Sequence, residues 1–330
     1  MRLLLIANPG AYRTASTDVP LGYERLAAHP DVELFHADTQ AMLAPGESIR
    51  ACRVEAGFRA EEFDGLREGS PQEHSPDDFD VAFCRTLKPF PERYLTRLQE
   101  RPLRYVNDPA GIERQLGLSF VVEAAAEFMP PTLITREADE AEAFLTEHGV
   151  VVAKRANSCG GRGVYKLWRQ QGQVVVDHVT DGAKRFRGLA ETLDRLGGEE
   201  LLFSRYLPRV TEGEKRVIAL DGMILGAYLR TSTTGHWIQN VSFGASCDLL
   251  EVSERDREIV ARTCEAYRRE GIHLLGYDLL RDDEGKWVVS EINAGNIGGV
   301  FRLETMGVEG VTDRVAQWLQ AFAAARLPSA

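Results

Sequence analysis

The first part of the chain alternates short apolar runs with segments of helical spacing. The runs that read as buried strands are RLLLIAN near the N-terminus, VELFHA, FDVAFCR (79–85) and LRYVN (103–107). Between them, apolar residues recur at helical intervals in YERLAAH and ERYLTRLQE. This alternation predicts an α/β N-terminal domain over residues 1–120.

Residues 44–78 interrupt the pattern. The stretch is polar, and Gly, Pro, Glu and Asp cluster towards its end. Such a composition is typical of loops, so we expect a poorly packed insertion or a mobile loop here.

A second unit follows, which we place at residues 121–200. FMPPTLIT leads into a helix, EADEAEAFLTEHG, with Thr135 as its N-cap and Gly149 at its end. A buried strand, VVVAKRA, then precedes the glycine-rich NSCGGRG. After it, VYKLWRQQGQVVVDHV predicts two strands joined by a turn.

Residues 201–330 favour antiparallel strands around one long helix. The strand-like segments are LLFSRYL, RVIALDGMILGAYLR and the hairpin LLGYDLLRDDEGKWVVSEIN, and the helix is SERDREIVARTCEAYRREG. The predicted fold class is therefore an α/β N-terminal domain followed by two α+β parts.

Composition narrows the range of functions. Hydrophobic residues make up 44% and charged residues 27% of the chain, a balance typical of a folded globular protein. The net charge of −11, without a dense Lys/Arg run, argues against nucleic acid and anionic membrane as partners. No apolar run is long enough to span a bilayer. Five scattered cysteines without metal-type spacing predict reduced thiols and a cytoplasmic protein.

The first candidate for chemistry is the glycine loop 157–163, which begins just after Lys154. Gly160, Gly161 and Gly163 let the backbone approach a ligand and turn N–H groups towards an anion. A Walker A pattern is absent, and a strand follows the loop where a phosphate-binding loop of that type needs a helix. The loop therefore reads as a flap that closes over phosphates, or, on its own evidence, as a plain hairpin turn.

The hairpin near residue 285 is the second candidate. If its turn is centred on residues 283–285, Asp278 lies opposite Glu291, and Asn293 lies on the same strand face as Glu291. Two facing carboxylates repel each other unless a positive charge lies between them. A Lys or Arg could supply that charge, but the three side chains also form an oxygen-only set that suits Mg²⁺. The alternative is a pair of solvated carboxylates on an edge hairpin.

Three arginines form a further candidate set. Arg85 and Arg230 each end an apolar run, and Arg216 lies in GEKRVIAL. A guanidinium at a strand end beside a cleft suits bidentate binding of carboxylate or phosphate. Each arginine alone fits a surface ion pair equally well, so we interpret them together.

Lys154 with its flap, RYLP, GEKRV and the acidic hairpin occur in the order and spacing of the ATP-grasp fold. In its motifs the chain resembles the bacterial glutathione synthetase family. The segments that carry the resemblance are FDVAFCRTLKPF (79–90), YVNDP (105–109), PPTLIT (130–135), KRANSCGGRGVYKL (154–167), YLPRVTEGEKRV (206–217), ALDG (219–222), GYDLL (276–280) and SEIN (290–293). The resemblance implies an ATP-grasp fold with an α/β N-terminal (pre-ATP-grasp) domain. It also implies an ATP- and Mg²⁺-dependent carboxylate–amine ligase that acts through an acyl phosphate.

The resemblance further implies a role for each matched residue. The implied nucleotide contacts are Lys154, Gly160, Gly161 and Gly163 for the phosphates, Tyr206 and Leu207 for the adenine, and Glu214 for the ribose. The implied ligands of one or two Mg²⁺ ions are Asp278, Glu291 and Asn293. The implied catalytic residues are Arg216 and Arg230, and the implied substrate contacts are Arg85 and Asn240. Its partners are then a small-molecule acid and an amine, in a possible homo-oligomer.

The chain also departs from the family pattern. Leu118 stands where the family has a lysine that contacts ATP, with Arg114 as the nearest cation. Ile238 stands where the family has an arginine, and AGNIGG (294–299) replaces the family's Thr/Ser/Pro-containing turn. Because these changes lie where the substrate is chosen, γ-glutamylcysteine with glycine is one candidate pair only. A peptide or amino-acid ligase of a specialised pathway and a non-catalytic nucleotide-binding subunit are the alternatives.

Overall fold

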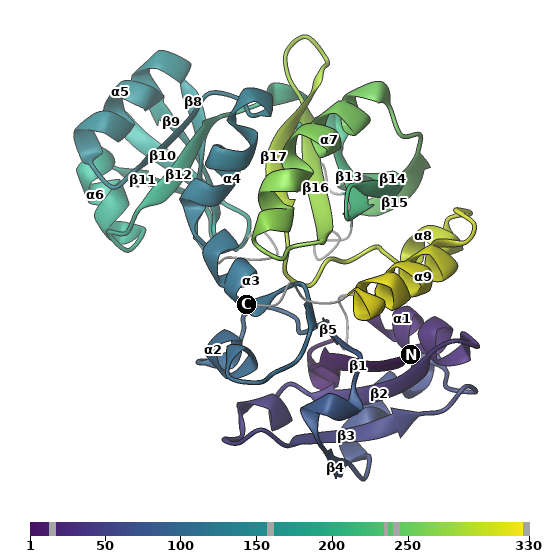
Figure 1. Cartoon of the computed structure of the whole chain (residues 1–330). Coiled ribbons are helices and arrows are strands. Elements are labelled where there is room, and N and C mark those ends of the chain that lie inside the picture. Colours follow the sequence, from purple (N-terminus) through teal and green to yellow (C-terminus); the bar gives the residue numbers. More distant parts are fainter. Residues whose placement is uncertain (13–17, 157–161, 234–236, 240–244, 326–330) are drawn as a thin grey trace.

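The computed structural model describes residues 1–12, 18–156, 162–233, 237–239 and 245–325. Each of three sheets forms its own layer with helices (Figure 1). The central and C-terminal sheets lie side by side, and the N-terminal sheet lies below both of them in this view. No helix in the described part of the chain combines the length and the apolar character that crossing a membrane requires.

The N-terminal sheet has six strands in the order β4-β3-β2-β1-β5-β6. The strands are β1 (Arg2–Ala7), β2 (Glu33–Asp38), β3 (Ile49–Val54), β4 (Gln72–His74), β5 (Val81–Cys84) and β6 (Tyr105–Val106). β1 pairs in parallel with β2 and β5, and Leu3 to Ile6 are at most 2% exposed. This continuous apolar run is what a parallel strand covered on both faces requires. The associated helices are α1 (Asp18–Ala28), α2 (Tyr94–Gln99) and α3 (Pro109–Gln115).

The segment 44–78 is packed, so the prediction of a poorly packed or mobile insertion is wrong. It supplies the antiparallel strands β3 and β4 and the 3₁₀ helix η3 (Ala60–Glu68). Ile49 is buried, and so is Phe63, whose ring lies edge-on to Tyr23 with centroids 4.9 Å apart. A few well-spaced apolar residues anchor the segment, while its many polar residues face solvent at the sheet edge.

The central sheet has the strand order β11-β10-β9-β8-β12-β7, and every neighbouring pair is antiparallel. Its strands are β7 (Thr132–Thr135), β8 (Val150–Arg155), β9 (Val164–Gln170), β10 (Gln173–His178), β11 (Gly182–Phe186) and β12 (Leu201–Arg205). Its helices are α5 (Ala138–His148) and α6 (Leu189–Arg195). Gly149 ends α5 with φ 72°, as predicted. The N-cap is Glu137, whose N–H donates to the hydroxyl of Thr135 (2.9 Å), so the predicted cap lies two residues early.

The C-terminal sheet is antiparallel in the order β15-β14-β13-β16-β17. Its strands are β13 (Glu214–Leu220), β14 (Met223–Thr231), β15 (Ser246–Leu250), β16 (Leu274–Arg281) and β17 (Trp287–Asn293). The helices that follow or cover it are α4 (Leu118–Ala125), α7 (Glu254–Arg269), α8 (Arg302–Thr305) and α9 (Val311–Ala324). The remaining short 3₁₀ helices are η1 (Pro9–Ala11), η2 (Ala41–Leu43), η4 (Pro76–Asp78), η5 (Ala126–Phe128) and η6 (Pro208–Glu212).

The domains in the structure do not follow the limits predicted from the sequence. β12 follows residue 200 but belongs to the central sheet, because it pairs with β7 and β8. Phe120 of α4 packs edge-on against Tyr267 of α7, so α4 joins the C-terminal core. Leu303 of α8 and Val315 of α9 are buried in the same core as β1. The chain therefore returns to its N-terminal domain at its C-terminal end (Figure 1).

Candidate active site

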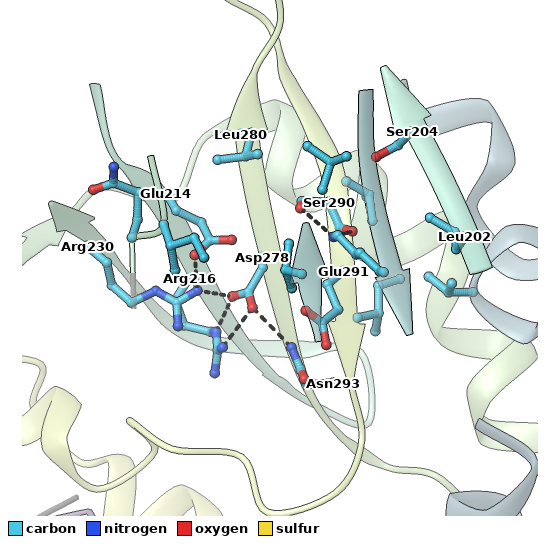
Figure 2. A pocket seen from close by; sticks show the side chains of 18 of the residues that line it. Leu202, Ser204, Glu214, Arg216, Arg230, Asp278, Leu280, Ser290, Glu291 and Asn293 are labelled. Carbon is cyan, nitrogen blue, oxygen red and sulfur yellow. Dashed lines mark hydrogen bonds and ion pairs between the residues drawn. The ribbon is translucent and has the colours of Figure 1, made fainter. Parts of the chain in front are cut away.

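A pocket of about 390 Å³ lies between the central and C-terminal sheets and extends to the N-terminal domain. Many of its lining side chains come from the facing strands of the two sheets (Figure 2). The residues predicted from the sequence that line it are Lys154, Tyr206, Leu207, Glu214, Arg216, Arg230, Asp278, Glu291 and Asn293. Arg85 and Gly163 are described but do not line the pocket. Gly160, Gly161 and Asn240 lie outside the described residues.

The strand register brings the acidic hairpin together as predicted. Asp278 on β16 pairs with Glu291 on β17, and the register shifts immediately after Asp278. The shift leaves Ser290 as the extra residue of a β-bulge, a feature that re-aims side chains next to functional sites. On its other side β16 pairs with β13, where Arg216 lies opposite Asp278. Arg230 on β14 in turn lies opposite Glu214.

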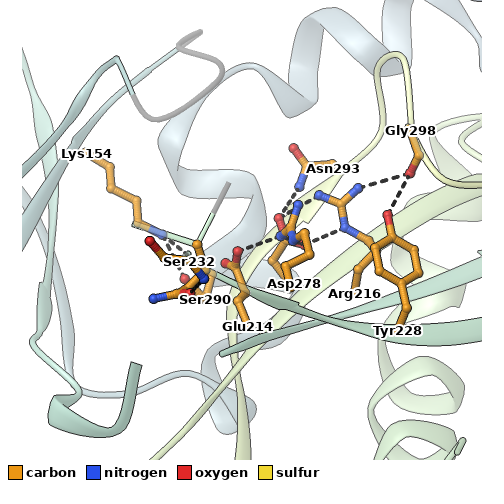
Figure 3. A network of polar contacts seen from close by, with 11 residues as sticks. Lys154, Glu214, Arg216, Tyr228, Ser232, Asp278, Ser290, Asn293 and Gly298 are labelled. Atoms are coloured by element: carbon orange, nitrogen blue, oxygen red, sulfur yellow. Dashed lines mark hydrogen bonds and ion pairs between the residues drawn. The ribbon is translucent and has the colours of Figure 1, made fainter. Parts of the chain in front are cut away.

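Asp278 is the centre of a buried polar network (Figure 3). Its carboxylate is 4% exposed and accepts from Arg216 Nε (2.5 Å) and Nη2 (2.9 Å). It also accepts from Arg230 Nη2 (2.6 Å) and Asn293 Nδ2 (3.1 Å). Burial acts to raise the pKa of Asp278, but the two arginine charges outweigh it and hold the pKa below its usual value. Asp278 is therefore a carboxylate at neutral pH.

Glu214 extends the network on the side of Arg230. Its Oε2 accepts from Arg230 Nη2 at 2.6 Å. Burial raises the pKa of the Glu214 carboxyl to about 7, although the charge of Arg230 acts in the opposite direction. Glu214 thus gains or loses its charge near neutral pH, unlike Asp278.

Lys154 connects the two sheets across the pocket. Its Nζ, on β8, donates to the backbone oxygen of Ser290 on β17 (2.8 Å) and to the Ser290 hydroxyl (3.1 Å) (Figure 3). The strand that follows the glycine loop begins at Val164, so the predicted strand–loop–strand order is confirmed. The backbone oxygen of Gly163 accepts from the N–H of Arg155 (2.9 Å), which joins the two strands at the base of the loop.

The acidic hairpin offers oxygen donors that fit Mg²⁺. Glu291 is exposed, and its carboxylate has no hydrogen-bond or ion-pair partner in the part of the chain that the structure describes. Asn293 turns its Nδ2 to Asp278, and a flip of the amide brings Oδ1 to that side instead, where a cation could be shared with the carboxylate. Within the described ranges, no three His, Cys, Asp or Glu residues group as metal ligands, so the set consists of two carboxylates and one amide. Oxygen-only sets of this kind are typical of Mg²⁺ sites completed by water and phosphate.

Arg85 lies outside the pocket, under the loop that follows β17. Its side chain is 1% exposed, and Nη2 donates to Asp18 Oδ2 (2.7 Å) and to the backbone oxygen of Ile297 (2.8 Å). Asp18 Oδ1 accepts from the N–H groups of Phe301 (2.8 Å) and Arg302 (3.0 Å). Asp18 lines the pocket and was missed from the sequence, because an isolated Asp in a polar stretch carries no local signal.

Two positions that depart from the family pattern also line the pocket. Leu118 lies at its apolar end, whereas Arg114 is half-exposed, pairs with Glu270 (2.7 Å) and does not line the pocket. Because Arg114 does not line the pocket, it does not replace the family's lysine at the position of Leu118. Ile238 is 9% exposed and lines the opposite part, beside Trp237, whose Nε1 donates to Asp177 of β10 (2.8 Å).

The family model described as "Prokaryotic glutathione synthetase, ATP-grasp domain" matches residues 119–306. The chain belongs to this family. Among its relatives, the glutathione synthetase of Parasynechococcus marenigrum (strain WH8102) is 31% identical over 264 residues, which cover 77% of this chain and 79% of the relative. That of Mesorhizobium japonicum is 29% identical and covers 83% and 84%. That of Neisseria meningitidis serogroup A is 25% identical and covers 96% and 99%.

Solved structures agree on the fold. D-cycloserine synthetase DcsG has a TM-score of 0.62 at 16% identity, with 98% of this chain and 99% of that chain covered. The ATP-grasp ligase PsnB, complexed with a phosphomimetic variant of its minimal precursor, Mg and ADP, has a TM-score of 0.56 at 15% identity, with 97% of both chains covered. The predicted ATP-grasp fold is confirmed. The predicted enzyme class is confirmed as well: the chain is a glutathione synthetase-like, ATP-dependent and ADP-forming C–N ligase.

Proposed function

We propose that this chain joins the carboxylate of a small acid to an amine through an acyl phosphate, with ATP bound as its Mg²⁺ complex. The observation that carries the proposal is the convergence of Lys154, Arg216 and Arg230 with the oxygen donors of the acidic hairpin on one pocket between two sheets. Cations and oxygen ligands at one place are what a transferring phosphoryl group requires.

In this proposal the nucleotide lies between the central and C-terminal sheets. Its adenine lies at the apolar end, against the backbone of Tyr206 and Leu207, and Glu214 contacts the ribose. Lys154 exchanges its contact with Ser290 for the phosphates, because an anionic phosphate attracts the ammonium more strongly than the neutral oxygens of Ser290 do. Gly160, Gly161 and Gly163 close the flap over the phosphates. The apolar lining at this end includes Leu118, Val121, Met129, Val152 and Leu202.

We assign Asp278, Glu291 and Asn293 as the residues that hold one or two Mg²⁺ ions. The bound ion supplies positive charge that lowers the cost of charge build-up on the phosphates. Glu291 is the most accessible of the three, because no described residue pairs with it. Asp278 keeps its negative charge through Arg216 and Arg230. Each of its oxygens already accepts two hydrogen bonds, so in this proposal it gives up at least one of them to hold the ion.

The chemistry follows from the weakness of a carboxylate as an acylating agent. The carboxylate of the acid attacks the γ-phosphorus of ATP, which forms an acyl phosphate and releases ADP. Arg216 and Arg230 offset the negative charge of this step and of the acyl intermediate. The neutral amine then attacks the acyl carbon, and phosphate leaves. Water must be excluded by the closed flap, because it hydrolyses an acyl phosphate.

The acid and the amine are small molecules in this proposal, and γ-glutamylcysteine with glycine is the first pair to test. Ile238 and Trp237 favour an acid with an apolar group as the second candidate, because they replace a charged contact by an apolar surface. We place the protein in the cytoplasm, in line with the free thiols of Cys52, Cys84 and Cys264. A homo-oligomer stays a prediction from the family.

A phosphate-release screen of acids against amines tests the proposal. We expect at least one pair to release phosphate only when acid, amine, ATP and Mg²⁺ are all present. Binding of ATP without turnover of any pair would favour the non-catalytic nucleotide-binding subunit instead. A variant with Glu291→Gln is the matched negative control, because it keeps the shape of the side chain and removes its charge.

A further inference from the structure

The C-terminal end of the glycine loop is held by a histidine from the next strand. His178 is the last residue of β10, and its ring Nε2 lies 2.9 Å from the backbone oxygen of Arg162. Because a carbonyl oxygen can only accept a hydrogen bond, Nε2 carries the proton and donates it. A second contact at this end is the hydrogen bond from the Arg155 N–H to the oxygen of Gly163, which continues the pairing of β8 with β9.

The imidazole of His178 is held in one orientation by its neighbours. Its side chain is 13% exposed, and the ring stacks on that of Tyr165, its partner in β9, with the centroids 4.9 Å apart. The hydroxyl of Thr180 is within hydrogen-bond distance of His178 Nδ1 (3.0 Å) and of Asp181 Oδ1 (2.9 Å). A donor that is already oriented loses little freedom when it binds the backbone of Arg162.

This end of β10 lies beside the pocket, although His178 does not line it. The preceding residue, Asp177, accepts from the indole of Trp237, which lines the pocket (2.8 Å). Ala156 and Val164, the two residues that flank the glycine loop, line it as well. Because side chains alternate between the two faces of a strand, His178 points to the face opposite Asp177. It can therefore act on a bound nucleotide only through the loop.

We propose that His178 is a positioning residue for ATP, which holds the peptide bond between Arg162 and Gly163 and thereby the end of the glycine loop that leads into β9. This inference rests on the proposed function, in which the loop contacts the phosphates. Glycines give a loop conformational freedom that is lost when a ligand binds, and a fixed end reduces that loss. The contact therefore favours nucleotides with the phosphates that the loop reaches, and leaves the binding of the adenosine part unchanged.

The test separates the hydrogen bond from the ring that makes it. His178→Phe keeps a ring that can stack on Tyr165 and removes the donor, whereas His178→Gln removes the ring and supplies an amide N–H near the position of Nε2. Each protein is titrated with Mg²⁺ and a non-hydrolysable ATP analogue, and separately with AMP. Because one hydrogen bond is lost, we expect His178→Phe to bind the ATP analogue about 3- to 10-fold more weakly than the wild type and AMP equally well. His178→Gln should bind both nucleotides like the wild type.

Trypsin gives a second measurement, because the peptide bond that His178 holds follows an arginine. Arg162 is exposed, and cleavage between Arg162 and Gly163 is identified by the masses of the fragments. Without nucleotide, this cleavage should be faster in His178→Phe than in the wild type or in His178→Gln. His148→Phe is the matched control and should change neither measurement. It replaces a histidine of similar side-chain exposure (12%) that stacks on Phe144 within α5.

The proposal is wrong if His178→Phe binds the ATP analogue as tightly as the wild type, or if it weakens the binding of AMP by the same factor. Cleavage after Arg162 that is no faster in His178→Phe would also contradict it. If His178→Gln behaves like His178→Phe, the ring and not the hydrogen bond is responsible, which overturns the proposal as well. Binding of the analogue that depends on His178, without phosphate release from any acid and amine, would contradict the ligase function alone.

Discussion

Replacing Asp278 by Asn tests how much the buried ion pairs of the site contribute to the stability of the protein, separately from their contribution to turnover. Asp278 is 4% exposed, and its carboxylate is the only charged partner of Arg216 among the described residues. In Asp278→Asn, Arg216 loses its charged partner and keeps at most a hydrogen bond to the neutral amide oxygen and the 3.4 Å contact with Gly298, whereas Arg230 keeps Glu214. Removing one partner of a buried ion pair costs about 3–5 kcal/mol, because a buried charge is left unpaired.

This cost is measurable as a thermal shift. For a chain of 330 residues, the unfolding entropy of about 2.1 cal/mol/K per residue converts it to a fall in Tm of roughly 4–7 °C. The assay is thermal unfolding followed by circular dichroism at neutral pH without nucleotide. Turnover should be lost as well, because the proposed metal site loses a charge.

Glu291→Gln is the matched variant, because it removes a carboxylate from the same hairpin that is exposed and unpaired. Its Tm should stay within about 1 °C of the wild type, as substitutions at exposed sites without partners change stability by about 0.5 kcal/mol or less. Its turnover should nevertheless be abolished. An Asp278→Asn protein as stable as the wild type would refute the buried-network reasoning, and an active Glu291→Gln protein would refute the metal assignment.

Three further substitutions test separate parts of the site. Lys154→Ala should weaken binding of a non-hydrolysable ATP analogue about 10- to 100-fold in calorimetry, because a charge-assisted contact to phosphate is lost; unchanged affinity would favour the plain-hairpin interpretation of the glycine loop. Burial raises the folded-state pKa of Glu214 from 4.5 to about 7, so the native state holds its proton more tightly and loses this stability as the pH rises through that window. The Tm of Glu214→Gln relative to wild type should therefore rise between pH 5 and pH 8, and a constant difference would contradict the assignment. Ile238→Arg should increase kcat/KM for γ-glutamylcysteine with glycine if the apolar surface disfavours that acid, whereas efficient wild-type turnover without any gain would show that the change is neutral.

The sequence by itself determined that the two carboxylates of the hairpin lie on neighbouring strands. The turn alone sets Asp278 opposite Ser290, as the pairs Arg281–Trp287 and Leu279–Val289 show, and the β-bulge at Ser290 is what brings Glu291 opposite Asp278. The absence of a helix signal after the glycine loop likewise predicted the strand that begins at Val164. These features are local, since each depends on residues within about twenty positions of one another.

The tertiary structure decided which distant groups meet. Asp278 binds Arg216 and Arg230 because β16, β13 and β14 are neighbours, and no local pattern specifies the lateral order of strands. The family resemblance predicts Arg85 as a substrate contact, whereas in the structure Arg85 is bound by Asp18 and by the backbone oxygen of Ile297, under the loop after β17. Burying a charge requires a partner, and that partner is chosen by how distant segments pack.

The segment 44–78 shows the same limit for the fold. Its composition is that of a loop, yet Ile49 and Ala51 are buried in one core, and Val54 and Phe63 in another, both formed largely by other parts of the chain. These few apolar side chains cannot form a core of their own, but they are enough to anchor the segment on existing ones. Composition and periodicity indicate which secondary structure a segment favours by itself. The surface against which it packs is supplied by residues far away in the sequence, and only the folded chain brings that surface into contact with it.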